Sequence, residues 1–510
     1  MGEISSPIIQ SGEKIMAFWL GIDCGGTFIK AGIYDNSGKE YATFRQSLTV
    51  ISENPGWAER DLNELWSACI AVIKGVLNQE IIKADSIKGV GISAQGKGIF
   101  LLDKQLQPLG KGILSSDQRA LSIVKQWQQE DIPTKLYPLT RQTLWTGHPV
   151  SILRWLKQFQ PERYQNIGAV LMSHDYLRFC LTGELGCEIT NISESNLYNM
   201  ETGKYDIQLA KLLGIDDIIS CFPPIINSSD IAGYITPEVA KITGLSVGTP
   251  VVGGLFDVVS TALCSGIQCE SVNQTTALNI VLGTWTVVSG ITDYIDQNQS
   301  FPFVYGRYAQ QNQFLVHEAS PTSAANLEWF TKQWVNLDYN EINNMIEELP
   351  KADSSILFVP FLYGSNAGLG IHSGFYGIQS IHSQAHLLQA IYEGVIFSLM
   401  THLERMLQRF PKTKTIRLTG GPARSKAWRQ MLADISGLPI EIPSVSETGC
   451  LGAALTAMVG NGIYPDFATA QKELQHEVIK VQPDLNVYEK YRNKYQKYTK
   501  FVQALKTLET

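Results

Sequence analysis

Residues 19–34 constrain the fold more than any other stretch of this chain. They form two apolar runs of strand length joined by Gly25, Gly26 and Thr27, a pattern that predicts a β-hairpin with a tight turn. Glycines let backbone N–H groups approach an anion, and the threonine hydroxyl adds a donor. Asp23 ends the first run, where a carboxylate can hold a divalent cation. The turn fits a metal-bound phosphate, or it is an ordinary hairpin turn whose polar groups satisfy their own backbone.

A second stretch, residues 277–290, repeats this pattern. An apolar run reaches Gly283 and Thr284 and then continues as a second apolar run. Two such units about half a chain apart predict two related domains that face one nucleotide, although chance similarity gives the same pattern.

Composition narrows the class of protein. With 510 residues, 44% of them hydrophobic and 17% charged, the chain can form two or more domains with substantial cores. The net charge of −7 gives no reason to expect nucleic acid or an anionic membrane as a partner. No apolar run is long enough to span a bilayer and no signal peptide is visible, so we expect a cytoplasmic protein. The eight cysteines form no Cys-x-x-Cys pair, which favours buried thiols over zinc or disulfides.

Polar residues follow the predicted strand over residues 87–93. Gln95, Gly96 and Lys97 lie where α/β domains place ligands, at the carboxyl end of a strand. They are candidates for substrate contacts, although Lys97 is equally well explained as a solvated loop lysine.

Further along, Asp117 and Arg119 put an acid and a base two residues apart, which suits several hydroxyls or a carboxylate. A surface ion pair would have the same sequence. Trp145 and His148 lie in a segment that mixes an aromatic ring with hydroxyls; His148 contacts a ligand or is a structural hydrogen-bonding residue. The dense polar stretch 191–199 is either pocket lining or an ordinary loop.

Two further glycine-rich segments are candidates for the substrate and nucleotide sites. Asp257 follows a glycine turn and begins a predicted helix, so it is either a helix cap or a base directed at a bound hydroxyl. Gly420 and Gly421 lie between a strand and a helix, where a planar base or ribose can approach the backbone, or where the two elements pack closely.

These segments occur in one order over residues 17–498. They are Asp23-Cys24-Gly25-Gly26-Thr27, Asp257 with its glycine-rich approach, Gly283-Thr284, Gly420-Gly421-Pro422-Ala423 followed by residues 428–434, and Gly449-Cys450-Leu451-Gly452-Ala453-Ala454. In this order and spacing the chain resembles the FGGY family of carbohydrate kinases.

The resemblance implies an α/β fold of two actin-like, ribonuclease-H-like domains with the active site in the cleft between them. It implies MgATP on the second domain, with adenosine against Gly420, Gly421 and Ala423 and the phosphates between the two glycine-threonine turns. By the same resemblance Asp23 would hold Mg²⁺, directly or through water, and Asp257 would accept the proton of the sugar hydroxyl that attacks the γ-phosphate. Phosphoryl transfer needs mainly positioning and charge neutralisation, which agrees with these residue types.

Within the family, residues 92–98, 144–149, 191–199 and 254–257 resemble the group of L-xylulose and 3-keto-L-gulonate kinases. Common relatives differ at Gly96-Lys97, where D-xylulose kinases typically have Met-His, and at Ser115, where many have Trp. A cation at position 97, together with Arg119, could pair with a sugar-acid carboxylate. We therefore expect a kinase for a terminal hydroxyl of a ketose or keto-sugar acid.

We expect residues 1–15 to form a flexible tail, residues 16–266 a sugar-binding domain and residues 267–505 an ATP-binding domain, in a protein that forms a homodimer. The alternatives are a kinase for another pentulose or polyol, of the D-xylulose type, and an actin-like ATPase that acts on a protein partner. A sugar-sensing repressor would need a basic DNA-binding domain, and a nicotinamide dehydrogenase a Gly-x-Gly-x-x-Gly helix start; the sequence shows neither.

Overall fold

The computed structural model describes residues 17–269, 276–283, 285–297, 299, 301–368, 371–445, 447–474 and 477–509. The expected tail, residues 1–15, lies outside the described residues, and so does Thr284 of the second predicted turn.

The first sheet contains the predicted hairpin. Its strands are β1 (Phe18–Cys24), β2 (Phe28–Asp35), β3 (Glu40–Ser47), β5 (Ile87–Ala94), β13 (Ile231–Tyr234), β14 (Pro250–Val252) and β15 (Leu255–Phe256). They lie in the order β13-β14-β5-β1-β2-β3, with β15 also paired to β5. β1 is antiparallel to β2 and parallel to β5, and β2 is antiparallel to β3.

The second sheet repeats this scheme. Its strands are β16 (Thr276–Leu282), β17 (Thr286–Thr292), β18 (Val304–Arg307), β19 (Phe314–Ser320), β22 (Thr413–Thr419), β23 (Ile440–Pro443) and β24 (Val478–Val481), in the order β18-β19-β17-β16-β22-β23-β24. β16 is antiparallel to β17 and parallel to β22, and β17 is antiparallel to β19. The central strands of the two sheets therefore share one topology, which confirms the internal duplication predicted from the two glycine turns.

Shorter strands and the helices complete the fold. The strands are β4 (Glu59–Arg60), β6 (Phe100–Asp103), β7 (Gly112–Ile113), β8 (Ile167–Leu171), β9 (Cys187–Glu188), β10 (Tyr198–Asn199), β11 (Lys204–Tyr205), β12 (Ile225–Ile226), β20 (Leu357–Val359) and β21 (Gly374–Tyr376). The helices of the first half are α1 (Leu62–Leu77), α2 (Leu121–Gln129), α3 (Ile132–Thr140), α4 (Pro149–Phe159), α5 (Pro161–Gln165), α6 (Ser173–Thr182), α7 (Ile189–Ile192), α8 (Ile207–Leu212), α9 (Pro237–Thr243) and α10 (Asp257–Ser265). Those of the second half are α11 (Ala325–Trp334), α12 (Tyr339–Glu347), α13 (Gln384–Arg409), α14 (Lys426–Ser436), α15 (Thr448–Gly460), α16 (Phe467–Glu473) and α17 (Leu485–Glu509), and short 3₁₀ turns occur at Ala84–Ser86, Asp216–Cys221 and Gly421–Arg424.

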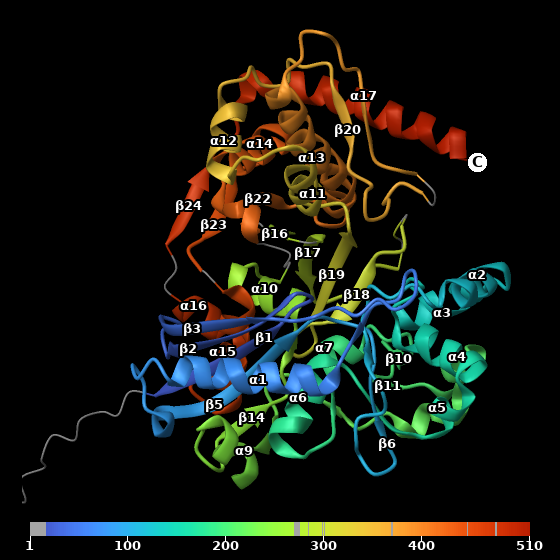
Figure 1. Cartoon of the computed structure of the whole chain (residues 1–510), viewed down its shortest axis with the longest axis vertical. Helices are drawn as coiled ribbons and strands as arrows, with labels where there is room; N and C mark the ends of the chain where they lie inside the picture. The colour runs from blue at the N-terminus through green and yellow to red at the C-terminus, as the bar shows by residue number, and fades with distance from the viewer. Residues whose placement is uncertain are drawn as a thin grey trace, which may run out of the picture.

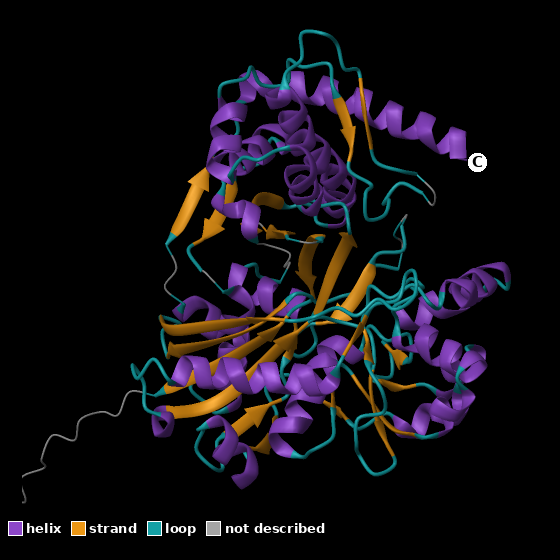
Figure 2. Cartoon of the chain, viewed as in Figure 1, coloured by secondary structure: helices purple, strands orange, loops and turns teal. Residues whose placement is uncertain are grey.

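Local sequence explains why these elements form where they do. The Asp61 side chain accepts hydrogen bonds from the backbone N–H groups of Asn63 and Glu64 and so caps α1. The apolar positions of that helix recur at helical spacing, and Leu65 and Cys69 among them are fully buried. In Figure 1 the first sheet, with α1 and α6, forms the lower part of the molecule, and β16, β17 and β19 lead up to the helices around α13. Figure 2 shows these helices gathered above the second sheet.

Helix α15 crosses from the second half of the chain to the first sheet. It packs against β1, β5 and α10. An ideal Cβ on Gly21 would lie 1.8 Å from the carbonyl oxygen of Cys450, and one on Gly91 would lie 1.9 Å from that of Ala453. Only glycine allows a helix backbone this close to the strands. The apolar core at this junction, which includes Trp19, thus belongs to both halves of the sequence.

Two negative expectations can be compared with the structure. The eight cysteines all lie in the described part of the chain, and none of them is in a disulfide. Among the described residues, none of the helices has the length and apolar character that crossing a bilayer requires.

Candidate active site

The first glycine turn joins β1 to β2 and is open to solvent. The N–H of Gly25 donates to the carbonyl of Phe28 (2.9 Å), and Gly26 and Thr27 are exposed. Arg60, which is buried, donates from Nη1 to the carbonyl of Gly25 (3.2 Å) and from Nη2 to that of Gly26. Since its carbonyls are held by Arg60, the turn keeps a fixed shape with its outer face available to an anion. No pattern in the sequence indicates this role for Arg60.

Asp23 lies beside this turn, between the two halves of the chain. In the strand registers it is opposite Lys30 on β2 and Ser93 on β5. Burial raises the pKa of Asp23 above its ordinary value, and the Lys30 ammonium opposes that shift. The first turn of α15 reaches the same carboxylate, because an ideal Cβ on Gly449 would lie 2.2 Å from Asp23 Cγ. A helix N-terminus favours negative charge, so α15 supports a carboxylate at this position.

Asp257 is the first residue of α10, at the end of β15. The register places Phe256 opposite Ala94 of β5, so α10 begins next to the loop that carries Gln95. Burial and the nearby Asp23 carboxylate raise the pKa of Asp257 to about 7. A carboxylate with a pKa near neutrality suits a general base. The two acids are close enough to interact, and a divalent cation beside them would favour the ionised form of both.

The loop over residues 95–97 connects the first turn to Asp257. The N–H of Gln95 donates to the carbonyl of Cys24 (2.9 Å). Its amide Nε2 is buried and finds no hydrogen-bond acceptor among the described residues. Gly96 packs against Phe256, whose ring would lie 2.3 Å from an ideal Cβ. Gln95 therefore has a donor available for a ligand.

Lys97 has a carboxylate partner. Its backbone adopts φ +60° and its N–H donates to Asn191 Oδ1 (2.9 Å). Its ammonium lies 2.7 Å from Glu194 Oε2 and 5.6 Å from the centroid of the Phe256 ring. It is thus not the solvated lysine of the simpler interpretation. The polar stretch 191–199 supplies two of these partners and is buried, so it lines the site.

Asp117 and Arg119 form an interior cluster. The Arg119 Nε lies 2.8 Å from Asp117 Oδ1, and Nη2 lies 2.8 Å from Glu59 Oε1. The guanidinium is fully buried and stacks on Trp57, 3.8 Å from the ring centroid. These contacts already neutralise Arg119 and favour a structural role over a sugar contact for the pair.

Trp145 contacts the second half of the chain, and His148 lies beside it. The indole Nε1 of Trp145 donates to the carbonyl of Ser115 (2.9 Å) and its ring meets Trp285 edge to face, with centroids 6.2 Å apart. His148 Nδ1 lies 3.0 Å from the Asn196 amide and 3.2 Å from the N–H of Trp145. Burial, together with the Lys97 charge, lowers the pKa of His148 to about 3. The ring is neutral, and because Nδ1 accepts both bonds its proton is assigned to Nε2.

The second-half loops lie side by side. Gly283 donates its N–H to the carbonyl of Trp285 (3.0 Å). Gly420 has φ +96°, and an ideal Cβ there would lie 2.0 Å from the carbonyl oxygen of Leu282. Gly421 is exposed, with nothing within 4 Å of an ideal Cβ, whereas the Ala423 side chain is buried in the core. Gly421 can therefore face a nucleotide, and Ala423 can contribute its backbone.

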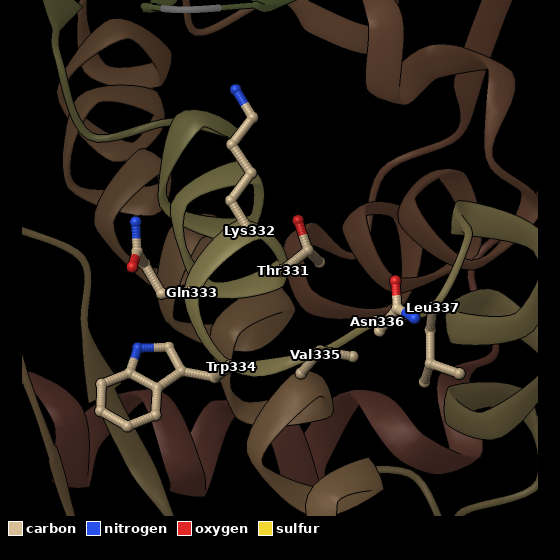
Figure 3. Close-up of a pocket in the computed structure, with 7 residues that line it drawn as sticks. All are labelled: Thr331, Lys332, Gln333, Trp334, Val335, Asn336 and Leu337. Carbon is tan, nitrogen blue, oxygen red and sulfur yellow. The ribbon is translucent and has the colours of Figure 1, made fainter.

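A surface hollow elsewhere in the second half holds none of the predicted residues. It has a volume of about 490 Å³ and is lined by residues 331–337, at the C-terminal end of α11 and in the segment that follows it (Figure 3). The predicted residues Asp23, Gln95, Lys97 and Asp257 gather instead where the first sheet, α10 and α15 meet, whereas Gly283 and Gly420 lie together at the ends of β16 and β22. Two sheets of one topology, with a glycine turn and a pair of carboxylates at the end of the first, are typical of phosphotransferases of the actin-like class.

Comparison with known proteins narrows this class. Residues 18–264 match the N-terminal domain, and residues 278–460 the C-terminal domain, of the FGGY family of carbohydrate kinases. The chain belongs to this family and is a carbohydrate kinase.

Two curated relatives and two solved structures agree with that assignment. A probable L-xylulose kinase of Pasteurella multocida is 61% identical over 97% of this chain and 100% of its own length. The L-xylulose/3-keto-L-gulonate kinase of Escherichia coli is 58% identical over 96% of this chain and 97% of its own. A ligand-bound xylulose kinase from Lactobacillus acidophilus superimposes with a TM-score of 0.88 at 22% identity, covering 97% of this chain and 99% of that one. A Plasmodium falciparum glycerol kinase with ADP does so with a TM-score of 0.83 at 19% identity, covering 96% and 98%. The two structures share the fold, which confirms the predicted actin-like architecture.

Proposed function

We propose that this kinase transfers the γ-phosphate of ATP to a terminal hydroxyl of L-xylulose or 3-keto-L-gulonate. Near-full-length identity to the Escherichia coli kinase of that name supports the choice of sugar. The observation that carries the chemistry is Asp257, which begins α10 beside Asp23 with a pKa of about 7.

In the proposed mechanism Asp257 accepts the proton of the attacking sugar hydroxyl. Gln95 and His148 have N–H donors that can orient the sugar, and Trp145 offers an apolar ring to its carbon face. The turn of Gly25, Gly26 and Thr27 would hold the phosphates from the first half, with Gly283 and Thr284 opposite. Asp23 would hold Mg²⁺, and Gly420, Gly421 and Ala423 the adenosine. Bound Mg²⁺ would supply charge neutralisation for the transferring phosphoryl group.

We further propose a sugar-binding domain over residues 16–266, an ATP-binding domain over residues 267–505, and a homodimer that works in the cytoplasm without nucleic acid. The duplicated sheets support the division. Light scattering coupled to size-exclusion chromatography tests the dimer.

The deciding experiment measures ADP release with Mg²⁺ across a panel of ketoses, polyols and keto-sugar acids, with a no-sugar control and Asp257→Asn. Strong stimulation by L-xylulose or 3-keto-L-gulonate that is absent in Asp257→Asn supports the proposal. Stimulation by D-xylulose alone would favour the alternative of a D-xylulose-type kinase; the relatives at 24–27% identity are named xylulose kinases. ADP release that no sugar stimulates would instead favour an ATPase acting on a protein partner.

A further inference from the structure

Glu194 is a buried carboxylate that contacts both halves of the chain. Its side chain is 1% exposed, with Oε2 2.7 Å from Lys97 Nζ and Oε1 2.8 Å from His317 Nε2. Lys97 belongs to the loop beside Asp257, and His317 lies on β19 of the second sheet. An ideal Cβ on Gly306 of β18 would lie 2.4 Å from Glu194 Oε1, so the second sheet closes over this carboxylate.

Glu194 is ionised. The His317 imidazole and the Lys97 ammonium hold its pKa far below the ordinary value despite complete burial. Its negative charge therefore offsets the positive charge of Lys97, 2.7 Å away. An ammonium with a carboxylate at 2.7 Å attracts a second carboxylate much less than a free ammonium does.

Most other charges near the reacting centre are acidic or already paired with a carboxylate; Arg60 is an exception, since it donates to the backbone carbonyls of Gly25 and Gly26. Burial, Asp23 and Glu194 raise the pKa of Asp257, and the Lys97 ammonium opposes that shift. Arg119 is neutralised by two carboxylates, and Lys30 lies 2.7 Å from Glu447. The carboxylates of Asp23, Asp257 and Glu194 would therefore repel a substrate carboxylate that entered beside them.

We propose that Glu194 sets the charge preference of the sugar site, so that the enzyme favours a neutral ketose over a sugar acid. This rests on the proposed function and adds a specificity residue to it. Glu194 does not take part in phosphoryl transfer; it acts through Lys97.

The test uses the isosteric variant Glu194→Gln and compares kcat/KM for 3-keto-L-gulonate with kcat/KM for L-xylulose. The ratio of sugar acid to ketose should rise about tenfold, which corresponds to about 1.4 kcal/mol. Lys97→Met should lower the same ratio. His317→Gln is the matched control, because it alters the other contact of Glu194 and keeps both charges, so the ratio should stay near that of the wild type.

A second comparison guards against misfolding of the single variant, which leaves a partly buried ammonium unpaired. The double variant Lys97→Met/Glu194→Gln removes both charges together, and its ratio should exceed that of Lys97→Met alone. The proposal would be overturned if Glu194→Gln left the ratio of sugar acid to ketose unchanged both in the wild type and in Lys97→Met, even where the two kcat/KM values changed together. Wild-type activity on neither sugar would refute the proposed function instead, so the two failures can be told apart.

Discussion

The Gly449→Ala substitution tests whether the position of the Asp23 carboxylate controls turnover. An ideal Cβ at Gly449 would lie 2.2 Å from Asp23 Cγ and 2.4 Å from Oδ2. Carbon contacts are favourable at about 3.5 Å, so the carboxylate must move by about 1 Å. Misplacement of about 1 Å in an active site costs about 10²-fold in rate, and we expect kcat to fall about that much. Helix α15 itself tolerates the change, because alanine favours a helix over glycine by about 1 kcal/mol.

The assay combines ADP release with urea unfolding of Gly449→Ala, Asp23→Ala and the double variant. With Asp23 present, overpacking should cost about 1–3 kcal/mol of unfolding free energy. In the Asp23→Ala background the clash is gone, and Gly449→Ala should cost nothing. Gly452→Ala is the control, since its Cβ would meet the Ser260 hydroxyl at 2.0 Å rather than Asp23; it should affect stability more than kcat. Turnover near the wild-type value, or equal destabilisation with and without Asp23, would refute this reasoning.

Three other substitutions probe the site and its support. Asp257→Asn should lower kcat by about 10²–10⁴-fold while ATP still binds. The kcat/KM of the wild type should rise as the pH passes through about 7, where Asp257 loses its proton. A pH profile that is flat across that range would show that Asp257 is only a helix cap. Arg119→Met should lower the free energy of unfolding by about 3–5 kcal/mol in urea, because it leaves the buried Asp117 carboxylate without a cation and Glu59 with Lys111 alone. Lys157→Met at a half-exposed pair should cost under about 1 kcal/mol. Gly420→Ala should destabilise the fold, since the φ of Gly420 is +96° and a carbonyl oxygen lies 2.0 Å from the position of the new Cβ. Gly421→Ala should leave the stability unchanged and raise the KM for ATP. Equal melting temperatures for the two variants would contradict this difference.

Local features of the fold were predictable from the sequence. The glycines at positions 25 and 26 identify the first turn. Asp61, followed by apolar residues at helical spacing, identifies the start of α1. Each depends on residues within a few positions of one another, where backbone conformation and hydrogen bonds are decided locally.

Partners distant in sequence were not predictable. Lys97 pairs with a residue 97 positions away, and Arg119 with one 60 positions away. The sequence around a lone lysine or arginine in a polar segment does not show whether a carboxylate from elsewhere in the chain pairs with it. Only the structure therefore separates the predicted sugar-site residues: among the described residues the Gln95 amide keeps a free donor, whereas the Arg119 charge is already matched by Asp117 and Glu59.

The packing of α15 on β1 and β5 has a consequence for how the protein is made. The first sheet leaves the ribosome early in synthesis, but the helix that covers one of its faces is encoded by residues 448–460. Until those residues emerge, the glycine-lined surface of β1 and β5 has no cover and is exposed to other chains and to chaperones. The first half thus cannot complete its core by itself, and two fragments divided at the middle of the sequence should recover a native fold only when mixed.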